Sequence, residues 1–235
     1  MKANHVHIWT ARPEQVAARQ WAELETLLDD RERDQAARFR FDEDRRAYVL
    51  AHGLRRQALS YELGAEPFAL QFSADRHGKP LMSSPSLSLP SLSQQMLPIH
   101  FSHSHNRRAV AVAATHIGPI GVDIEGNEDV ADGDGLLAPF VEYSDVQGFH
   151  AQWTALEAFW KADGKGLDGA NPRIRLARCG ERAEVFANAG SSRAVIYALE
   201  LQDDCAAALA LMQPHAQAVH HIEVFRLFNC GQERR

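Results

Sequence analysis

The sequence predicts an α+β protein of two lobes, and this fold class depends on three observations. Each half of the 235 residues contains an amphipathic helix. In both halves, runs typical of β-strands follow that helix, so the order of elements is similar although no residue-level repeat is evident. The most chemically distinctive stretch begins after Gly118. We therefore expect an N-terminal lobe at residues 1–118 and a C-terminal lobe at residues 119–235.

Composition and charge place the chain among ordinary globular proteins. Hydrophobic residues make up 45% and charged residues 24% of it, and no apolar run approaches the ~20 residues that a membrane span needs. The first residues lack the apolar block of a secretory signal. The net charge of −6 argues against general binding of nucleic acid. Three widely spaced cysteines fit neither a disulfide framework nor a zinc site, so we expect a cytoplasmic protein.

In the first lobe, one helix is predicted more clearly than any other element. It runs from Asp42 to Leu63 with alanine and leucine along one face, and Gly64 is a natural stop. The other elements expected here are strands at residues 5–9, 68–73, 99–104 and 107–115, a helix that opens at Pro13, a short helix or solvated extension at residues 29–38, a turn at residues 76–80 and a Ser/Leu/Pro loop at residues 83–95.

Four arginines on the helix of residues 42–63 are predicted to point in different directions. At about 100° per residue, Arg45 and Arg56 face solvent. Arg46 and Arg55 fall on the borders of the apolar stripe, where an arginine keeps its stem packed while its head reaches a neighbouring cleft. Arg46 and Arg55 are therefore the better candidates for ligand contact, although surface arginines with packed stems explain the pattern equally well.

The second lobe is predicted to hold a long helix and a series of strands. Ser144 is expected to cap the start of this helix, which ends near Gly164 and buries Trp153 and Leu156. The acidic stretch at residues 128–135 lacks the ligand spacing of an EF-hand and is expected to be a solvated loop. Strands are predicted at residues 173–177, 182–187, 194–201, 205–212 and 221–228.

Two carboxylates, Asp123 and Glu125, end the apolar run that starts this lobe. In an extended chain, residues two apart point to the same face, so these side chains lie together while Ile124 turns into the core. Two acids forced together repel each other unless a cation lies between them. Hard oxygen ligands of this kind suit Mg²⁺ or Mn²⁺. A strand that runs into a polar turn explains this stretch alone equally well.

A second motif lies on the long helix, where residues 153–167 read W-T-A-L-E-A-F-W-K-A-D-G-K-G-L. Glu157 and Lys161 are four positions apart, so they share one side of the helix at the edge of its apolar stripe. From there Glu157 can serve as a third metal ligand and Lys161 can neutralise a phosphate. A routine glutamate–lysine helix pair is the alternative.

Taken together, these motifs resemble those of the 4′-phosphopantetheinyl transferases, specifically the two-lobed monomeric kind. G-V-D-I-E at residues 121–125 is followed by W-T-x-x-E-A-x-x-K-x-x-G-K-G-L at residues 153–167. Further segments agree in order, namely Arg38-Phe39 with the arginine-bearing helix after it, His77-Gly78-Lys79-Pro80, and Phe101-Ser102-His103-Ser104. The resemblance spans roughly residues 31–167.

The resemblance implies two similar α/β lobes related by pseudo-two-fold symmetry, with the active site between them. It also implies a monomer that moves the 4′-phosphopantetheine arm of coenzyme A to a serine of an apo acyl or peptidyl carrier protein, with Mg²⁺, releasing adenosine 3′,5′-bisphosphate. Neither nucleic acid nor a membrane is an expected partner. On the matching positions, the Mg²⁺ ligands are Asp123, Glu125 and Glu157, the catalytic residues are Glu157 and Lys161, and the coenzyme A contacts are Arg46, Lys79, Ser102, His103 and Lys161.

Elementary chemistry agrees with these implied roles. Attack on a pyrophosphate needs a metal and cations to stabilise the charge that develops on the phosphoryl oxygens and the leaving group. The serine hydroxyl must lose a proton, for which Glu157, or a water held through the metal, is the candidate base. A partly protonated His103 would suit contact with a phosphate.

The chain departs from the family at two positions. Leu156 stands where the family usually has a lysine, immediately before the helix glutamate, and His100 replaces an asparagine two residues before Ser102. The missing lysine leaves open a degenerate family member that binds coenzyme A or a carrier protein without turnover. A zinc-dependent hydrolase built on His103 and His105 is a third hypothesis, which no further cluster of ligands in the sequence supports.

Overall fold

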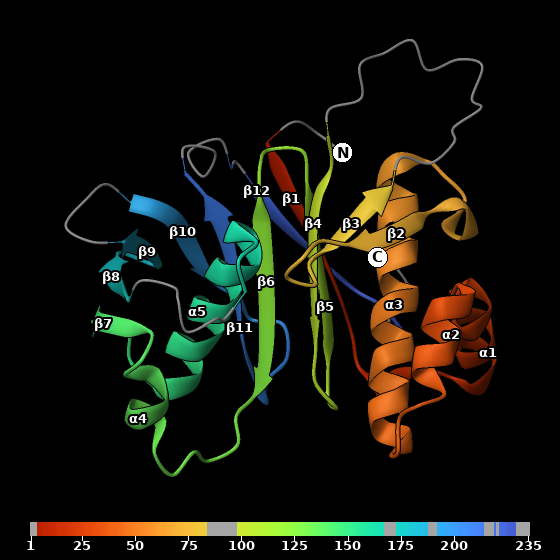
Figure 1. The fold of residues 1–235 in the computed structure, drawn as a ribbon, viewed down its shortest axis with the longest axis horizontal. Helices are drawn as coiled ribbons and strands as arrows, with labels where there is room; N and C mark the ends of the chain where they lie inside the picture. The colour runs from red at the N-terminus through yellow and green to blue at the C-terminus, as the bar shows by residue number, and fades with distance from the viewer. Residues whose placement is uncertain are drawn as a thin grey trace, which may run out of the picture.

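The computed structural model describes residues 4–83, 98–166, 173–187, 192–213, 219 and 221–228. The N-terminal helices lie at one side of the molecule, two main β-sheets pass through its middle, and the second sheet continues past the long C-terminal helix on the other side (Figure 1). The predicted α+β class is confirmed. The predicted Ser/Leu/Pro loop at residues 83–95 lies, apart from Ser83, outside the described residues.

Most N-terminal elements agree with the predicted ones, but the strand at Pro80–Ser83 was not expected, and the helix expected to open at Pro13 begins at Ala18, after a 3₁₀ turn at Pro13–Gln15. The helix expected at residues 42–63 has those bounds, and it ends at Gly64, whose φ of 62° is the left-handed conformation that favours glycine. In order, the elements are β1 (His5–Ala11), η1 (Pro13–Gln15), α1 (Ala18–Leu27), α2 (Asp30–Ala36), α3 (Asp42–Leu63), η2 (Pro67–Ala69), β2 (Gln71–Ala74), β3 (Pro80–Ser83), β4 (His100–His105) and β5 (Val110–Thr115).

One prediction on α3 is wrong, because Arg56 does not face solvent. Its side chain is 1% exposed, and its guanidinium donates hydrogen bonds to the carboxylates of Asp29 and Glu32 and to the carbonyl of Leu70. Helix α2 and the chain after α3 cover this side of the helix. Arg55 is also buried and donates to Glu32. The periodicity of α3 alone contains no information about these neighbours.

The C-terminal elements include two that the sequence pattern did not indicate, a short helix within the expected loop and a strand before the long helix. Ser144 does not cap that helix, which starts at Phe149 after Gly148; the Ser144 hydroxyl instead accepts from the N–H of Val146 at 3.1 Å. In order, the elements are β6 (Ile120–Gly126), α4 (Gly133–Leu137), β7 (Val141–Ser144), α5 (Phe149–Asp163), β8 (Ile174–Cys179), β9 (Arg182–Ala187), β10 (Ser192–Ala198), β11 (Cys205–Met212) and β12 (His221–Arg226).

The two large sheets approach each other at β4 and β6. The four-stranded sheet has the order β12-β1-β5-β4, and the six-stranded sheet has the order β6-β11-β10-β9-β8-β7. The hydroxyl of Ser102 on β4 accepts from the N–H of Val122 on β6 at 3.1 Å. Strand β12, from the end of the chain, pairs in parallel with β1 and so completes the N-terminal sheet. The lobe boundary after residue 118 and the pseudo-two-fold symmetry stay predictions.

Three clusters of buried side chains fill the spaces between these layers. One packs α3 onto the four-stranded sheet, one lies between the two sheets, and one packs α5 onto the six-stranded sheet. Strand β5 contributes to two of them, because Val110 and Val112 pack toward α3 whereas Ala111 and Ala113 pack toward the other sheet. Its small and β-branched residues suit burial on both faces. No helix that the structure describes is long and apolar enough to cross a membrane.

Candidate active site

The carboxylates of Asp123 and Glu125 lie on the face of β6 that is turned toward α5. Ile124, between them, is fully buried in the cluster between the two sheets, as the alternation of a strand predicts. Asp123 is 1% exposed, whereas Glu125 is half-buried. A buried carboxylate requires compensation by hydrogen bonds or a cation, so the partners of Asp123 decide what the site can do.

Gly121 allows α5 to approach β6 closely enough to complete the site. A Cβ atom at this position would lie 2.0 Å from the carbonyl oxygen of Ala158 and 2.6 Å from the backbone nitrogen of Ala162. Only glycine permits such an approach of two backbones. Glu157 and Lys161 come directly before Ala158 and Ala162 in the chain. The close approach of α5 to β6 therefore also brings their side chains to the carboxylates of β6. The sequence indicated this role only through a glycine inside an apolar strand.

Asp123, Glu125 and Glu157, which we call the acid trio, come together as predicted. Their nearest carboxylate oxygens all lie within 4.8 Å of one another. Lys161 accompanies them, with its Nζ 2.5 Å from Asp123 Oδ1 and 3.7 Å from Glu157 Oε2. The Ser104 hydroxyl donates to Asp123 Oδ1 at 2.8 Å and accepts from Lys161 Nζ at 2.9 Å. Ser104 had no predicted role, although it alternates with Ser102 on the same strand.

The acid trio carries more negative charge than its surroundings compensate. Burial and the charges of Asp123 and Glu157 raise the pKa of Glu125 to about 7. Burial and the charge of Asp123 also raise the pKa of Glu157, against the opposing effect of Lys161. Asp123 Oδ2 is buried and has no hydrogen-bond partner among the described residues. Three converging carboxylates with an unpartnered oxygen fit a hard divalent cation such as Mg²⁺.

A cavity of about 270 Å³ lies next to this site and is lined by residues from both sides of the predicted lobe boundary. Lys79 joins its two sides, because its Nζ donates to the backbone carbonyls of Lys161 at 2.7 Å and Ala162 at 3.2 Å. Burial lowers the pKa of Lys79. The lining residues are His77, Gly78, Lys79, Pro80, Phe101, Ser102, His103, Trp160, Lys161, Gly164 and Gly166.

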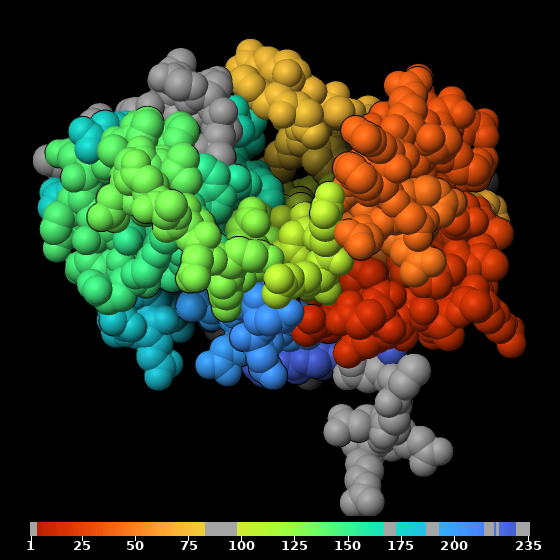
Figure 2. Space-filling model, turned by 90° about the horizontal axis from the view of Figure 1, so that it is seen from below, coloured from red at the N-terminus to blue at the C-terminus, as the bar shows by residue number. Residues whose placement is uncertain are grey.

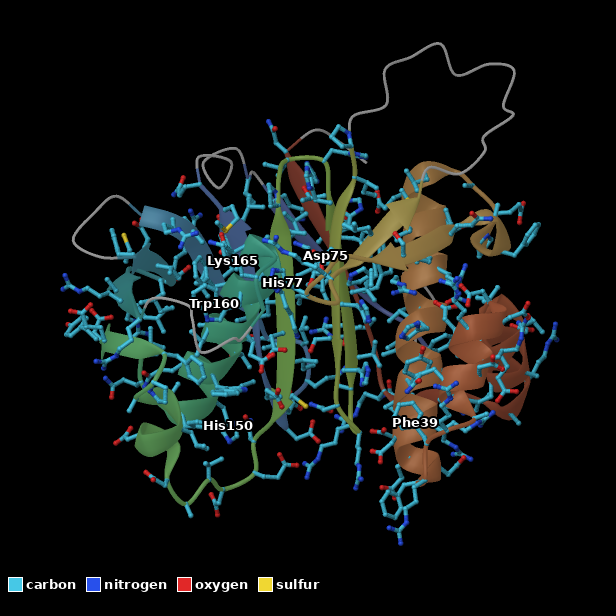
Figure 3. The ribbon with its side chains drawn as sticks, in the orientation of Figure 1. Phe39, Asp75, His77, His150, Trp160 and Lys165 are labelled. Atoms are coloured by element: carbon cyan, nitrogen blue, oxygen red, sulfur yellow. The ribbon has the colours of Figure 1, made fainter. Side chains whose placement is uncertain are left out.

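The figures show how the two lobes meet at this place. Asp75 and His77, from the turn between β2 and β3, lie across from Trp160 on α5 and from Lys165, which follows the end of this helix (Figure 3). Seen from below, the surface is hollowed between the C-terminal lobe, in green, and the helices of the N-terminal lobe, in orange (Figure 2). Residues far apart in the sequence thus share one concave region.

The structure brings four of the five predicted coenzyme A contacts to this cavity. Lys79, Ser102, His103 and Lys161 line it, whereas Arg46 does not. Arg46 is exposed on the first part of α3, with its Nε 2.7 Å from the carboxylate of Asp42. The position of Arg46 on α3 therefore does not by itself place its side chain beside the other four predicted coenzyme A contacts.

His103 differs from expectation in its charge. Burial and the nearby charges of Arg55 and His52 lower the pKa of His103 well below its usual value. In the ligand-free protein this histidine is therefore neutral at pH 7, and not partly protonated. Its Nδ1 is buried and has no hydrogen-bond partner among the described residues. Neither His103 nor His105 belongs to a group of three potential metal ligands in the described part of the chain, so the zinc hydrolase gains no support.

Comparison with known proteins gives concordant similarities. A family model described as "4'-phosphopantetheinyl transferase, N-terminal" matches residues 11–117. The 4'-phosphopantetheinyl transferase HetI of Nostoc sp. is 29% identical over 177 residues, which cover 70% of this chain and 71% of that protein. A 4'-phosphopantetheinyl transferase of Bacillus subtilis is 32% identical over 148 residues, or 57% of this chain and 59% of that protein. A third relative, 4'-phosphopantetheinyl transferase ffp of Bacillus subtilis, is 30% identical over 156 residues, or 61% of this chain and 63% of that protein.

Proposed function

Because the chain belongs to the 4′-phosphopantetheinyl transferase superfamily, we propose that it transfers the phosphopantetheine arm of coenzyme A to a serine of an apo acyl or peptidyl carrier protein. The predicted family and class of enzyme are confirmed. The reaction and its residues are our proposal, and the observation that carries it is the acid trio beside Lys161 at the edge of the cavity.

In the proposed reaction, the serine oxygen attacks the phosphorus that bears the pantetheine arm. The bond from that phosphorus to the bridging oxygen of the pyrophosphate breaks, and adenosine 3′,5′-bisphosphate leaves. Asp123, Glu125 and Glu157 would hold Mg²⁺, which when bound supplies positive charge to the phosphoryl oxygens. Lys161 is the nearest ammonium to the acid trio, so it is placed to pair with the same oxygens.

The serine proton is proposed to go to Glu157. A carboxylate whose pKa is raised is a stronger base than an ordinary one, and burial has this effect on Glu157. Its position on α5, which the close approach at Gly121 supports, would keep it beside the attacked phosphorus. Asp123 serves instead as an orienting group, because it is tied to Ser104 and Lys161 by hydrogen bonds.

Coenzyme A is proposed to occupy the cavity between the lobes. Lys79, Ser102 and His103 line the cavity and offer it an ammonium, a hydroxyl and an imidazole. The exposed guanidinium of Arg46 would leave Asp42 and turn toward the 3′-phosphate, at the cost of a surface ion pair that is worth little. The chain is proposed to act as a cytoplasmic monomer with no nucleic-acid or membrane partner.

The alternative, a family member that binds without turnover, depends on Leu156. Its side chain is fully buried in the core between α5 and the six-stranded sheet, as predicted. A lysine there would bury its ammonium in an apolar environment, which is costly. We therefore propose that the chemistry of this chain uses no cation at position 156.

Incubation with coenzyme A, Mg²⁺ and a panel of apo acyl and peptidyl carrier proteins tests the proposal. We expect the mass of at least one carrier to increase by one phosphopantetheine arm. Glu157→Gln should abolish this gain, and Glu142→Gln, an exposed acid on β7, should not change it. Full activity of Glu157→Gln would refute the roles given to this residue. Calorimetric binding of coenzyme A by the wild type without product on any carrier would establish the alternative.

A further inference from the structure

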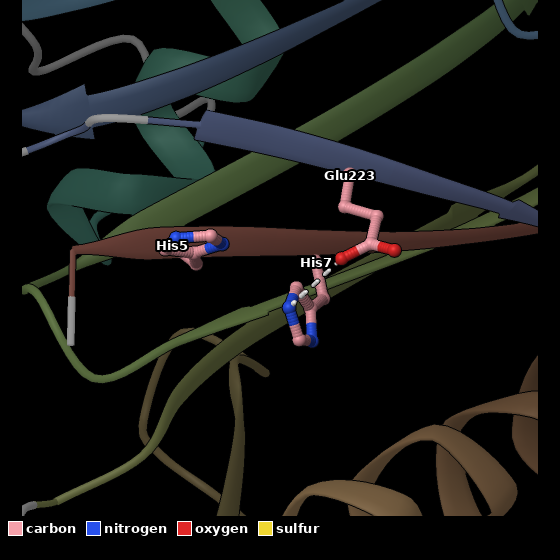
Figure 4. A group of neighbouring side chains, drawn as sticks. All are labelled: His5, His7 and Glu223. Carbon is pink, nitrogen blue, oxygen red and sulfur yellow. Dashed lines mark ion pairs between the residues drawn. The ribbon is translucent and has the colours of Figure 1, made fainter. Parts of the chain in front are cut away.

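A second group of potential metal ligands is separate from the acid trio and lies where the first and last described strands pair. It consists of His5 and His7 on β1 and Glu223 on β12 (Figure 4). In the parallel register of these strands, His5 is opposite His221 and His7 is opposite Glu223. Residues two apart on a strand share a face, so all four side chains project on the same side of the sheet.

A buried carboxylate orients His7. The side chain of Glu62, in the last turn of α3, is 0% exposed, and its Oε1 lies 2.6 Å from His7 Nδ1. An ionised carboxylate only accepts, so Nδ1 carries the hydrogen of this bond. The other ring nitrogen, Nε2, then keeps its lone pair. A histidine whose second nitrogen is held by a carboxylate is the usual arrangement of a metal-ligating imidazole.

The lone pair of His7 Nε2 faces another acceptor. Glu223 Oε2 lies 3.6 Å from it, which is longer than a hydrogen bond. Two acceptors that face each other at this distance call for a cation between them. The cation is either a second proton on His7 or a metal ion, and the presence of His5 on the same face favours the metal.

We propose that His5, His7 and Glu223 bind a transition metal of the Zn²⁺ class, at a site separate from the acid trio. Their ligand atoms all lie within 4.8 Å of one another, and a tetrahedral site with bonds near 2.1 Å needs them about 3.4 Å apart. Glu223 is 48% exposed, so its side chain is free to close this difference. Imidazole with carboxylate suits Zn²⁺ or Co²⁺ better than Mg²⁺. His221, whose ring centroid is 5.5 Å from that of His5, or water would complete the shell.

The proposed metal would fasten the last described strand to the first. The ligands come from β1 and β12, and the orienting carboxylate comes from α3, so one ion connects three elements. The ligands from the two strands are far apart in the unfolded chain, and binding therefore stabilises the folded state. This inference does not depend on the proposed transferase activity.

Titration of the chelator-treated full chain with Co²⁺, in excess Mg²⁺ that occupies the acid trio, tests the proposal. We expect one equivalent of Co²⁺ to bind with the absorption of a tetrahedral N/O site and without the thiolate charge-transfer band that binding to any of the three cysteines would give. Zn²⁺ at a hundredfold excess over its Kd should raise the Tm by about 5–10 °C. A Tm that does not change with Zn²⁺ would overturn the proposal.

Point variants distinguish Co²⁺ binding at His5, His7 and Glu223 from binding at the acid trio. Glu223 is partly exposed, so Glu223→Gln should abolish the absorption band of bound Co²⁺ while the protein stays folded. His7→Gln should also abolish this band. Glu157→Gln and His116→Gln should leave Co²⁺ binding unchanged, because neither residue belongs to the proposed site. Unchanged binding by Glu223→Gln would refute the site even if His7→Gln fails to fold.

Discussion

Two clusters of charged side chains lie in the two lobes, and they differ in whether their charges are balanced. The first, which we call the arginine cluster, contains Asp29, Glu32, His52, Arg55 and Arg56 and joins α2 to α3. The second is the acid trio together with Lys161, the one ammonium close to it among the described residues. Both include side chains that are largely or fully buried. The formal charges of the first cluster balance one another, although Arg55 Nε is buried without a hydrogen-bond partner among the described residues, whereas the carboxylates of the second outnumber their cation.

The pKa values of one acid from each cluster express this difference. Burial alone would raise the pKa of Glu32, but hydrogen bonds from His52 and the N–H of Asp29, with the charge of Arg56, lower it to about 2. In the acid trio, burial and the neighbouring acids act in the same direction and raise the pKa of Glu125 to about 7. Charge compensated within the chain thus indicates a structural role, and uncompensated charge beside a cavity indicates a site of binding or chemistry.

Neutralising the acid of the arginine cluster should have the largest effect on stability. Glu32→Gln leaves Arg55 and Arg56 buried without their shared anion, and we expect the free energy of unfolding to fall by about 3–5 kcal/mol. Urea denaturation at pH 7 measures this loss. Asp30→Asn, on the same helix but exposed, should have little effect. A Glu32→Gln protein as stable as the wild type would remove the contrast between the clusters.

Neutralising an acid of the trio should change stability in the opposite direction. Glu125→Gln relieves repulsion in the metal-free protein, and at pH 8 we expect a gain on the order of 1 kcal/mol, kept small because Glu125 retains contact with water. Its affinity for Mg²⁺ should fall at least about tenfold. Denaturation in chelator gives the first quantity and calorimetry the second, with Glu142→Gln as the matched control. A loss of metal-free stability in Glu125→Gln would show that the trio is balanced after all.

The smallest expected effect is the dependence of Mg²⁺ binding on pH. The pKa of Glu125 is raised to about 7 in the metal-free protein, so a proton competes with the metal below that pH. Affinity for Mg²⁺ should therefore fall about fivefold from pH 7 to pH 6 and level off above pH 8. Calorimetry in two buffers of different ionisation enthalpy also reports the proton released. A flat profile in the wild type, equal to that of Glu125→Gln, would contradict the raised pKa.

The sequence predicted those parts of the molecule that depend on local periodicity. The bounds of α3, the outward pair Asp123 and Glu125, and the shared face of Glu157 and Lys161 all follow from the spacing of residues along one element. These features need no knowledge of what lies opposite.

What the sequence did not predict depends on contacts between elements. Arg56 is buried because α2 brings two carboxylates to it, and Ser144 fails as a helix cap because β7 ends there. Gly121 and Ser104 matter through α5, which the pattern of β6 and β4 does not reveal. The pairing of β1 with β12 also joins segments that no local pattern connects.

This last pairing has a consequence for how the protein is made. During translation, β1 leaves the ribosome long before β12, because most of the described chain lies between the two strands. Until β12 arrives, the nascent N-terminal sheet exposes β1 as an unpaired edge, which is a template for wrong association. The final closure is also a contact of very long sequence separation and is therefore slow. We expect a nascent chain that stalls before β12 to depend on chaperones that shield this edge.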